Sequence, residues 1–157
     1  MLFFKPNVDK LKEKGDVRGL IKALKHKDVS IRRNAAKALG DLKASDAIDA
    51  LIKALSDEDV GVRIEVARAL GKLKDSKAIE PLLEVVRKDE SLDVKIEAAK
   101  ALKEIGYSKA TELLVGLVSQ SLKIPKEMAE KIVSEGKIVD AILDKKKFID
   151  RFFKRKT

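Results

Sequence analysis

Residues 62–73 read VRIEVARALGKL, and two other stretches of the chain nearly repeat them. The first is IRRNAAKALGDL at 31–42 and the second is VKIEAAKALKEI at 94–105. Apolar residues within each copy recur every three or four positions, which is typical of one buried face of an α-helix. Two columns run through all three copies: Leu39, Leu70 and Leu102, and Ala36, Ala67 and Ala99. The copies therefore predict three equivalent helices, which we call A helices.

A short polar connector and a second apolar stretch follow each copy. These stretches are AIDALIKAL (47–55), AIEPLLEVV (78–86) and ATELLVGLV (110–118), which we expect to form B helices. Ser45, Ser76 and Ser108 fall in one column of the connectors, and we expect them to be N-caps, because a hydroxyl accepts a hydrogen bond from a free helical N–H. Pro81 requires either that its helix begins later than Ser76 or that its first turn is irregular.

The pattern continues at both ends of the chain in weaker form. VRGLIKAL (17–24) matches the B helix with an offset of 31 residues, while PKEMAEKIV (125–133) and IVDAIL (138–143) resemble a degenerate pair. A helix pair with two apolar sides buries them by stacking on its neighbours, and terminal repeats are then atypical. We therefore predict an all-α protein, a right-handed α-solenoid of about five stacked antiparallel helix pairs.

The repeat boundaries follow from these alignments. We predict one domain over residues 1–157. Its parts are an N-terminal capping repeat at 1–26, core repeats at 27–57, 58–89 and 90–120, and a degenerate C-terminal capping repeat with a basic tail at 121–157.

The stretch DVSIRRNAAKALGDLKASDAIDALIKAL (28–55) resembles the short HEAT-like repeats of the phycobilisome-lyase type, which belong to the armadillo-like helical proteins. The likeness covers about residues 16–120. In that family an Asp and an Arg recur near the start of the A helix, and the matching pairs here are Asp28 with Arg32 and Asp59 with Arg63. Ser91 and Lys95 replace them in the third copy. We interpret these charges as a structural ladder between repeats.

Composition argues against most catalytic chemistry. The chain has no Cys and a single His, His26, which falls in a connector and which we expect to be solvated. A His- or Cys-based zinc site and a Ser–His–Asp or Cys–His nucleophile therefore cannot be assembled. Deoxyhypusine hydroxylases resemble this repeat but carry paired His-Glu motifs for iron, which are missing here. We predict no enzyme, no catalytic residue, no cofactor and no metal, with a diverged lyase or DNA glycosylase as a remote alternative.

The short apolar run before Lys5 is too short for a signal peptide, and we expect a cytoplasmic protein with no transmembrane segment. Few Asn and Gln and a charged content of 39% favour a thermophilic origin. The net charge of +9 lies at the ends: +4 over residues 1–26, zero over 27–121 and +5 over 122–157.

The polar columns of the B helices predict the interaction surface, since helical solenoids usually present these helices on a concave face. The predicted partner-binding residues are Arg18, Lys22, Asp49, Lys53, Glu80, Glu84, Arg87 and Glu112. Their charge runs from basic to acidic along the chain, which suits a protein partner of complementary charge. We predict a monomeric scaffold that binds another protein on this face.

A nucleic-acid-binding accessory protein that uses its basic ends is the alternative. The carboxylates of the B helices interrupt a phosphate-binding track, and the basic row Lys37, Arg68 and Lys100 on the A helices has Glu65 and Glu97 one turn away. The C-terminal stretch DKKKFIDRFFKRKT (144–157) has three interpretations: a capping helix, a basic contact, or a membrane-surface helix. Its candidate contact residues are Arg151, Lys154, Arg155 and Lys156.

Overall fold

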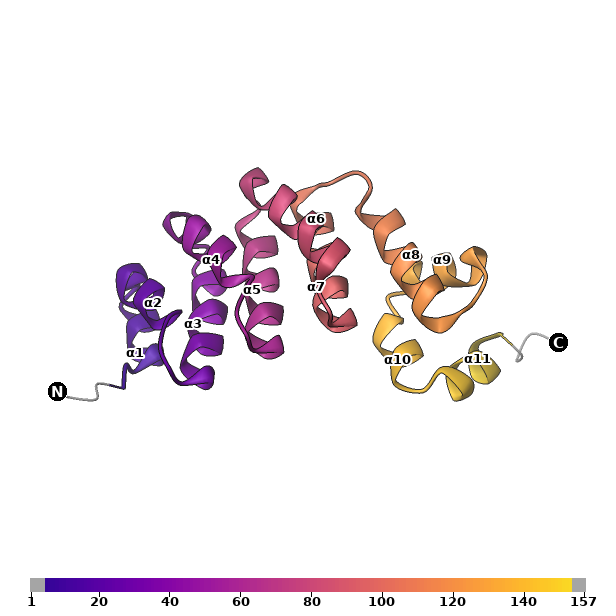
Figure 1. The fold of residues 1–157 in the computed structure, drawn as a ribbon, viewed down its shortest axis with the longest axis horizontal. Coiled ribbons are helices and arrows are strands. Elements are labelled where there is room, and N and C mark those ends of the chain that lie inside the picture. Colours follow the sequence, from indigo (N-terminus) through magenta and orange to yellow (C-terminus); the bar gives the residue numbers. More distant parts are fainter. Residues whose placement is uncertain (1–4, 154–157) are drawn as a thin grey trace. The chain divides into compact units, whose positions relative to one another are not determined.

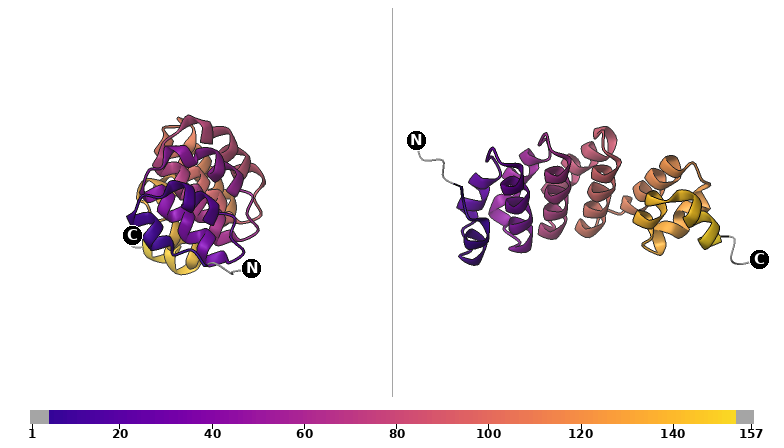
Figure 2. Two further views of the ribbon diagram at one scale, coloured as in Figure 1. Left: turned by 90° about the vertical axis from the view of Figure 1, so that its left-hand side faces the viewer. Right: turned by 90° about the horizontal axis from the view of Figure 1, so that it is seen from below.

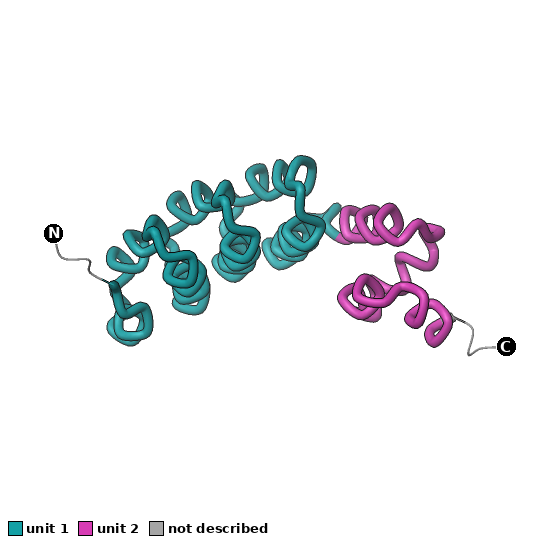
Figure 3. The backbone as a smooth tube through the Cα atoms, turned by 60° about the horizontal axis from the view of Figure 1, so that its bottom comes forward, with its two compact units in different colours: residues 1–110 teal, residues 111–157 magenta. Residues whose placement is uncertain are grey.

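A computed structural model of the chain describes residues 5–153, and every regular element in that range is helical (Figure 1). The prediction of an all-α fold is confirmed. The chain divides into two compact units, residues 1–110 and 111–157 (Figure 3). The α-helices of the first unit are α1 (Val8–Glu13), α2 (Val17–Ala23), α3 (Val29–Asp41), α4 (Ile48–Ala54), α5 (Val60–Leu73), α6 (Ile79–Lys88) and α7 (Leu92–Ile105).

The first unit is an α-solenoid built of two layers, as the views of Figures 2 and 3 show. Helices α1, α3, α5 and α7 pack against one another in chain order and form the A layer. Helices α2, α4 and α6 form the B layer, and each contacts the A helix that follows it. The predicted A and B helices of the first two core repeats are thus α3 with α4, and α5 with α6.

The repeated columns form the core of this stack. Leu39, Leu70 and Leu102 are fully buried, and so are Ala36, Ala67 and Ala99. Small residues allow the A helices to approach closely: a Cβ at Gly40 would lie 2.8 Å from the Cα of Ala69. At Gly71 it would lie 3.0 Å from the Cα of Ala101, so the same close approach recurs between α5 and α7.

Each A helix of the three copies begins and ends in the same way. The side chains of Asp28, Asp59 and Ser91 cap α3, α5 and α7 by accepting backbone N–H groups of the first turn. The residues after the helices, Lys43, Lys74 and Gly106, share a left-handed conformation with φ of 48°, 53° and 97°. The repeat therefore specifies the turn as well as the helix, although glycine, which adopts this conformation most easily, stands there in the third copy alone.

The prediction of serine N-caps for the B helices is wrong. Ser45 and Ser76 are the first residues of the 3-10 helices η1 (Ser45–Ala47) and η2 (Ser76–Ala78), and Ser108 lies in the turn before α8. The N-cap of η2 is Asp75, whose carboxylate accepts the backbone N–H of Lys77 at 2.9 Å. The α-helix itself starts at Ile79, so Pro81 is its third residue, where no intrahelical N–H is required.

The second unit contains α8 (Ala110–Leu122), α9 (Lys126–Ser134), α10 (Ile138–Leu143) and α11 (Lys145–Phe153). Its buried apolar residues come from α8, α9, α10 and the connector residue Ile124, with Val118, Ile132 and Ala141 fully covered. Helix α11 packs on α10, and the ring of Phe148 stacks on that of Phe152 with 4.9 Å between centroids.

Equivalent columns predict equivalent energetic costs. Leu39→Ala, Leu70→Ala and Leu102→Ala each remove a fully buried side chain, so each should lower the free energy of unfolding by about 2–5 kcal/mol. Leu70 lies on α5, between α3 and α7, and should be near the upper limit. Urea unfolding followed by circular dichroism measures this, and three variants as stable as wild type would contradict the stacked core.

An ion-paired aspartate connects three successive A helices. Asp41, the last residue of α3, has its carboxylate oxygens 2.7 Å from Nζ of Lys12 on α1 and 2.7 Å from Nζ of Lys72 on α5. Hydrogen bonds from Lys12 and Lys72 lower the pKa of Asp41 from 3.8 to about 2. The ionised form is therefore the one that the folded state favours.

Asp41→Asn should remove a pH-dependent contribution to stability. Because the pKa of Asp41 is lower in the folded state, its stabilisation is present above about pH 4 and disappears as the pH falls towards 2. Both lysines are substantially exposed, so wild type should exceed the variant by about 0.5–1 kcal/mol at neutral pH, and this difference should shrink by about pH 3. Urea unfolding across this pH range measures the difference. Asp46→Asn, at an exposed site, is the control. A difference in stability between wild type and Asp41→Asn that stays constant with pH would contradict the lowered pKa of Asp41.

Candidate protein-interaction surface

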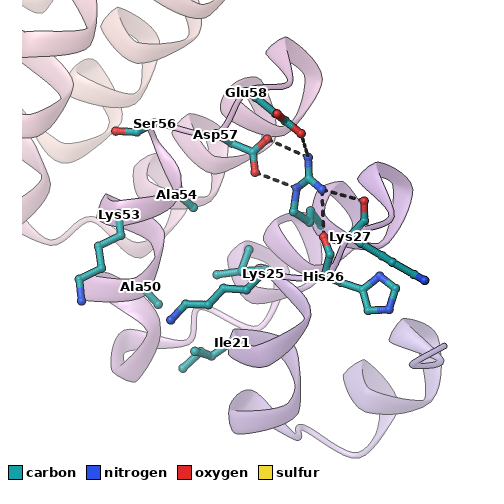
Figure 4. Close-up of a pocket in the computed structure, with 12 residues that line it drawn as sticks. Ile21, Lys25, His26, Lys27, Ala50, Lys53, Ala54, Ser56, Asp57 and Glu58 are labelled. Atoms are coloured by element: carbon teal, nitrogen blue, oxygen red, sulfur yellow. Dashed lines mark hydrogen bonds and ion pairs between the residues drawn. The ribbon is translucent and has the colours of Figure 1, made fainter. Parts of the chain in front are cut away.

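An arginine at the start of α3 joins two successive connectors. The Arg32 side chain is 8% exposed and donates two hydrogen bonds to the Asp57 carboxylate, at 2.8 and 3.1 Å. Its remaining terminal nitrogen, Nη1, donates to the carbonyl oxygens of His26 and Lys27, at 2.9 and 3.2 Å (Figure 4). The contact with Asp57 raises the pKa of Arg32, so the guanidinium keeps its charge. The connector before α3 is thereby fixed to the connector before α5.

The same arrangement recurs one repeat later. Arg63 donates to the Asp89 carboxylate at 2.9 and 3.2 Å and to the carbonyl oxygens of Asp57 and Glu58 at 2.8 and 3.2 Å. The interpretation of these charges as a ladder between repeats is supported for the two arginines, and their carboxylate partners are not the Asp28 and Asp59 of the same motif. The carboxylates of Asp28 and Asp59 cap α3 and α5. Asp57 and Asp89, which lie two residues before the caps Asp59 and Ser91, accept the hydrogen bonds of Arg32 and Arg63.

The single histidine belongs to this ladder. His26 Nδ1 accepts the backbone N–H of Asp28 at 3.0 Å, as the carboxylates of Asp57 and Asp89 accept the N–H groups of Asp59 and Ser91 at 2.9 Å. His26 is half-buried, so the expectation of a merely solvated residue is wrong. In the first connector, His26 therefore occupies the position that Asp57 and Asp89 occupy in the next two connectors. In the third copy of the repeat, Lys95 replaces the arginine.

The ladder fixes the connectors that carry the B helices, and the predicted binding residues lie on those helices. Arg18, Lys22, Asp49, Lys53, Glu80, Glu84 and Arg87 are on α2, α4 and α6, and all are exposed. Glu112 is also exposed but belongs to α8 in the second unit. The B helices of the first unit thus present one polar surface, defined by the seven residues named first, which we call the B-layer surface.

The carboxylates and cations of α6 largely neutralise one another. Arg87 Nη1 lies 3.5 Å from a Glu80 oxygen and 3.6 Å from a Glu84 oxygen. Glu84 also pairs with Lys88, and this contact lowers the pKa of Glu84. The basic row on the A layer is neutralised as well, since Arg68 bonds Glu97 at 3.0 Å and Glu65 at 2.9 Å. These regions therefore leave little net charge for a partner.

Helix α2 is different because its cations have no carboxylate partner among residues 5–153. Arg18 and Lys22 lie one turn apart, and Lys25 follows in the turn after the helix. Within residues 5–153 none of these three, nor Lys53 on α4, is ion-paired. Like charges one turn apart repel by about 0.2–0.5 kcal/mol. An anionic group supplied from outside would relieve this repulsion.

A groove of about 800 Å³ opens between α2 and α4 (Figure 4). We call it the α2–α4 groove; its lining includes Ile21, Lys25, Lys27, Arg32, Ala50, Lys53, Ala54, Asp57 and Glu58. Ile21 on α2 and Lys25 in the turn after it extend towards α4. The predicted binding set contains Lys53 but omits Lys25 and the apolar floor. The size of a groove depends on how side chains fill it in three dimensions, which helical periodicity does not report.

The second unit holds the predicted tail contact. Arg151 is exposed on α11, while Lys154, Arg155 and Lys156 lie outside the described residues. Nζ of Lys131 and Nζ of Lys137 lie 5.1 and 4.7 Å from the Phe152 ring centroid, which is within range of a cation–π contact. Phe152 therefore contacts side chains outside its own helix, as a capping helix requires.

Two further findings on the described chain concern metal ions and membranes. No group of three or more His, Cys, Asp or Glu side chains that could hold a metal ion occurs within residues 5–153. Over the same range, none of the helices combines the length and the apolar character needed to cross a membrane.

Removing a ladder arginine should be costly. Arg32→Ala would leave the Asp57 carboxylate, 11% exposed, without its partner, and should lower the free energy of unfolding by about 3–5 kcal/mol. Arg32→Lys keeps the charge but cannot bond the carboxylate in bidentate fashion, so its cost should be intermediate. Chemical denaturation measures all variants.

Arg33→Ala is the matched control for this prediction. Arg33 is 50% exposed and reaches Asp59 at 3.4 Å, so its loss should cost at most about 0.5–1 kcal/mol. If Arg32→Ala and Arg33→Ala prove equally mild, the ladder does not hold the connectors.

Comparison with known proteins agrees with the geometry of the first unit. A family model described as HEAT repeats matches residues 17–103, from the start of α2 into α7 and more than half of the chain. No significant match was found among curated proteins. The matched region contains α2 to α6 and most of α7, with the contacts of Arg32 and Arg63 and the α2–α4 groove. Solenoids of this kind commonly use such surfaces for protein binding. The chain therefore belongs to the HEAT-repeat family.

Proposed function

We propose that this protein is a non-catalytic scaffold that binds a partner protein on its B-layer surface, which we assign to the concave face of the solenoid. The observation that carries the proposal is a row of exposed polar side chains on α2, α4 and α6. Arg32 and Arg63 hold these helices in register, because they bond the connectors at the ends of the helices. A surface that is already fixed loses little conformational entropy when a partner binds.

The charge distribution supports a protein partner. The surface combines unpaired cations on α2 and α4 with carboxylates on α4 and α6, so it offers both signs within one unit. Such a pattern suits a partner whose charges alternate in a complementary way, because electrostatics then sets orientation and association rate. A continuous basic track, which phosphate backbones require, is interrupted by Asp49, Glu80 and Glu84.

A second candidate function, binding of nucleic acid by a basic end of the chain, is favoured by α11. Lys145, Lys146, Lys147 and Arg151 are all exposed on this nine-residue helix. Lys147 pairs with Asp144 at 3.5 Å, which leaves three of the four cations with no ion pair among the described residues.

Site-specific photo-crosslinking tests the scaffold function. A benzoylphenylalanine residue placed at Asp49 or at Glu84 should capture a partner from an extract of the native cells after nuclease treatment, because both positions face solvent on the B layer. The same residue at Lys37, exposed on α3 of the A layer, is the matched control. Mass spectrometry identifies the captured protein.

The identified partner then provides a quantitative test. Asp49→Lys, Glu80→Lys and Glu84→Lys combined should lower its affinity at least about tenfold, which is about 1.4 kcal/mol. Isothermal titration calorimetry measures this, and circular dichroism checks the fold. Adducts of equal yield at Lys37, or an affinity that survives the triple change, would place the binding site elsewhere.

A further inference from the structure

The α2–α4 groove has an apolar floor bordered by cations. Ile21 from α2, with Ala50 and Ala54 one turn apart on α4, supply the apolar part. Lys25, in the turn after α2, and Lys53, on α4, lie beside it. The two alanines are small, so the space between the helices is not filled from within the chain.

The charges that line the groove are unbalanced. Its cations are Lys25, Lys27, Lys53 and Arg32, and its carboxylates are Asp57 and Glu58. Asp57 is already engaged by Arg32, and Glu58 lies 3.6 Å from the same guanidinium with 88% of its side chain exposed. Lys25 and Lys53 therefore remain available, and both carboxylates are concentrated around Arg32.

The next groove of the repeat is a natural comparison. It lies between α4 and α6, measures about 340 Å³ and is lined by Ile52, Pro81, Val85 and charged neighbours. Equivalent positions of the two grooves are 31 residues apart. Ile52 is the equivalent of Ile21, but the equivalents of the floor residues Ala50 and Ala54 are the larger Pro81 and Val85. The equivalents of Lys25 and Lys53 are Ser56 and Glu84, and Glu84 pairs with Lys88. Both the open floor and the unpaired cations are thus specific to the α2–α4 groove.

We propose that the α2–α4 groove binds an acidic peptide segment of the partner protein. One apolar side chain of the segment packs on Ile21, Ala50 and Ala54, and flanking carboxylates pair with Lys25 and Lys53. Arg18 and Lys22, further along α2, add attraction during the approach. This inference rests on the proposed scaffold function and assigns the α2–α4 groove to one acidic segment of a partner whose other segments meet the carboxylates of α4 and α6.

A peptide fits these features better than a nucleic acid does. The floor is aliphatic, and no Phe, Tyr or Trp lines the groove. Its one ring is the imidazole of His26, which the Asp28 N–H holds in the connector, so successive bases have no row of rings on which to stack. Glu58 at the ladder end of the groove repels a phosphate chain that would continue past Lys25 and Lys53. An acidic segment meets the cations and can end before this carboxylate.

Selection from a random twelve-residue peptide library, displayed on phage, against the full chain tests the assignment. Enriched peptides should contain an apolar residue flanked by Asp or Glu. A synthetic, fluorescein-labelled copy of the most enriched peptide then reports affinity by anisotropy. The double variant Lys25→Glu, Lys53→Glu should weaken binding at least about tenfold, and Lys25→Ala, Lys53→Ala should weaken it less, because it removes attraction without adding repulsion.

The double variant Lys37→Glu, Lys103→Glu is the matched control, since it changes the net charge equally at exposed sites on the A layer. It should bind the peptide like wild type. Peptides without acidic enrichment, no enriched peptide, or equal binding by both charge-reversed variants would overturn the groove assignment. A 15-base-pair DNA duplex that displaces the peptide and itself depends on Lys25 and Lys53 would also overturn it. None of these outcomes decides the scaffold function, which the photo-crosslinks at Asp49 and Glu84 test separately.

Discussion

The structure of the first unit depends on a guanidinium held between two connectors. Arg32 bonds the carbonyl oxygens of one connector and the Asp57 carboxylate of the next, and Arg63 repeats this one step later. A buried charge is stable when it is paired and fully hydrogen-bonded, and each arginine here satisfies both conditions. Apolar columns bring the A helices together, but burial is non-directional. The rungs supply the direction, because a bidentate pair fixes where each connector lies.

The third copy of the repeat lacks the features that would extend this arrangement. Lys95 occupies the position at which Arg32 and Arg63 bond the next connector. Lys103 occupies the position at which Gly40 and Gly71 allow the next A helix to approach closely. A lysine at the second position carries a side chain into the space that close packing requires. The last A helix of the first unit, α7, therefore lacks both the arginine and the glycine that α3 and α5 carry at these positions. The first compact unit ends at residue 110, shortly after this helix.

Much of this fold could be predicted from the sequence because the columns of Leu and Ala report burial directly. Leu39, Leu70 and Leu102 follow helical periodicity, and each is fully buried. The arginine partners could not be predicted from spacing alone: Asp28 is four residues before Arg32, which suggests a helical pair, yet it is an N-cap with extended backbone. The available signal was that Asp57 and Asp89 lie 32 residues apart, as Leu70 and Leu102 do, which marks them as equivalent positions of the repeat. The α2–α4 groove was missed because its volume depends on two alanines that a helical pattern treats as ordinary core.

A rigid ladder also explains how neighbouring B helices can carry different chemistry. Since the connectors hold the geometry, exposed positions on α2, α4 and α6 change without cost to the stack, because surface substitutions rarely alter stability by more than about 0.5 kcal/mol. On α6 the column residues pair with one another, so their charge is satisfied within the chain. On α2 the equivalent positions repel one another and gain stability when an anion arrives. In a stack of near-identical repeats, binding specificity is therefore to be sought where the charges lack internal partners.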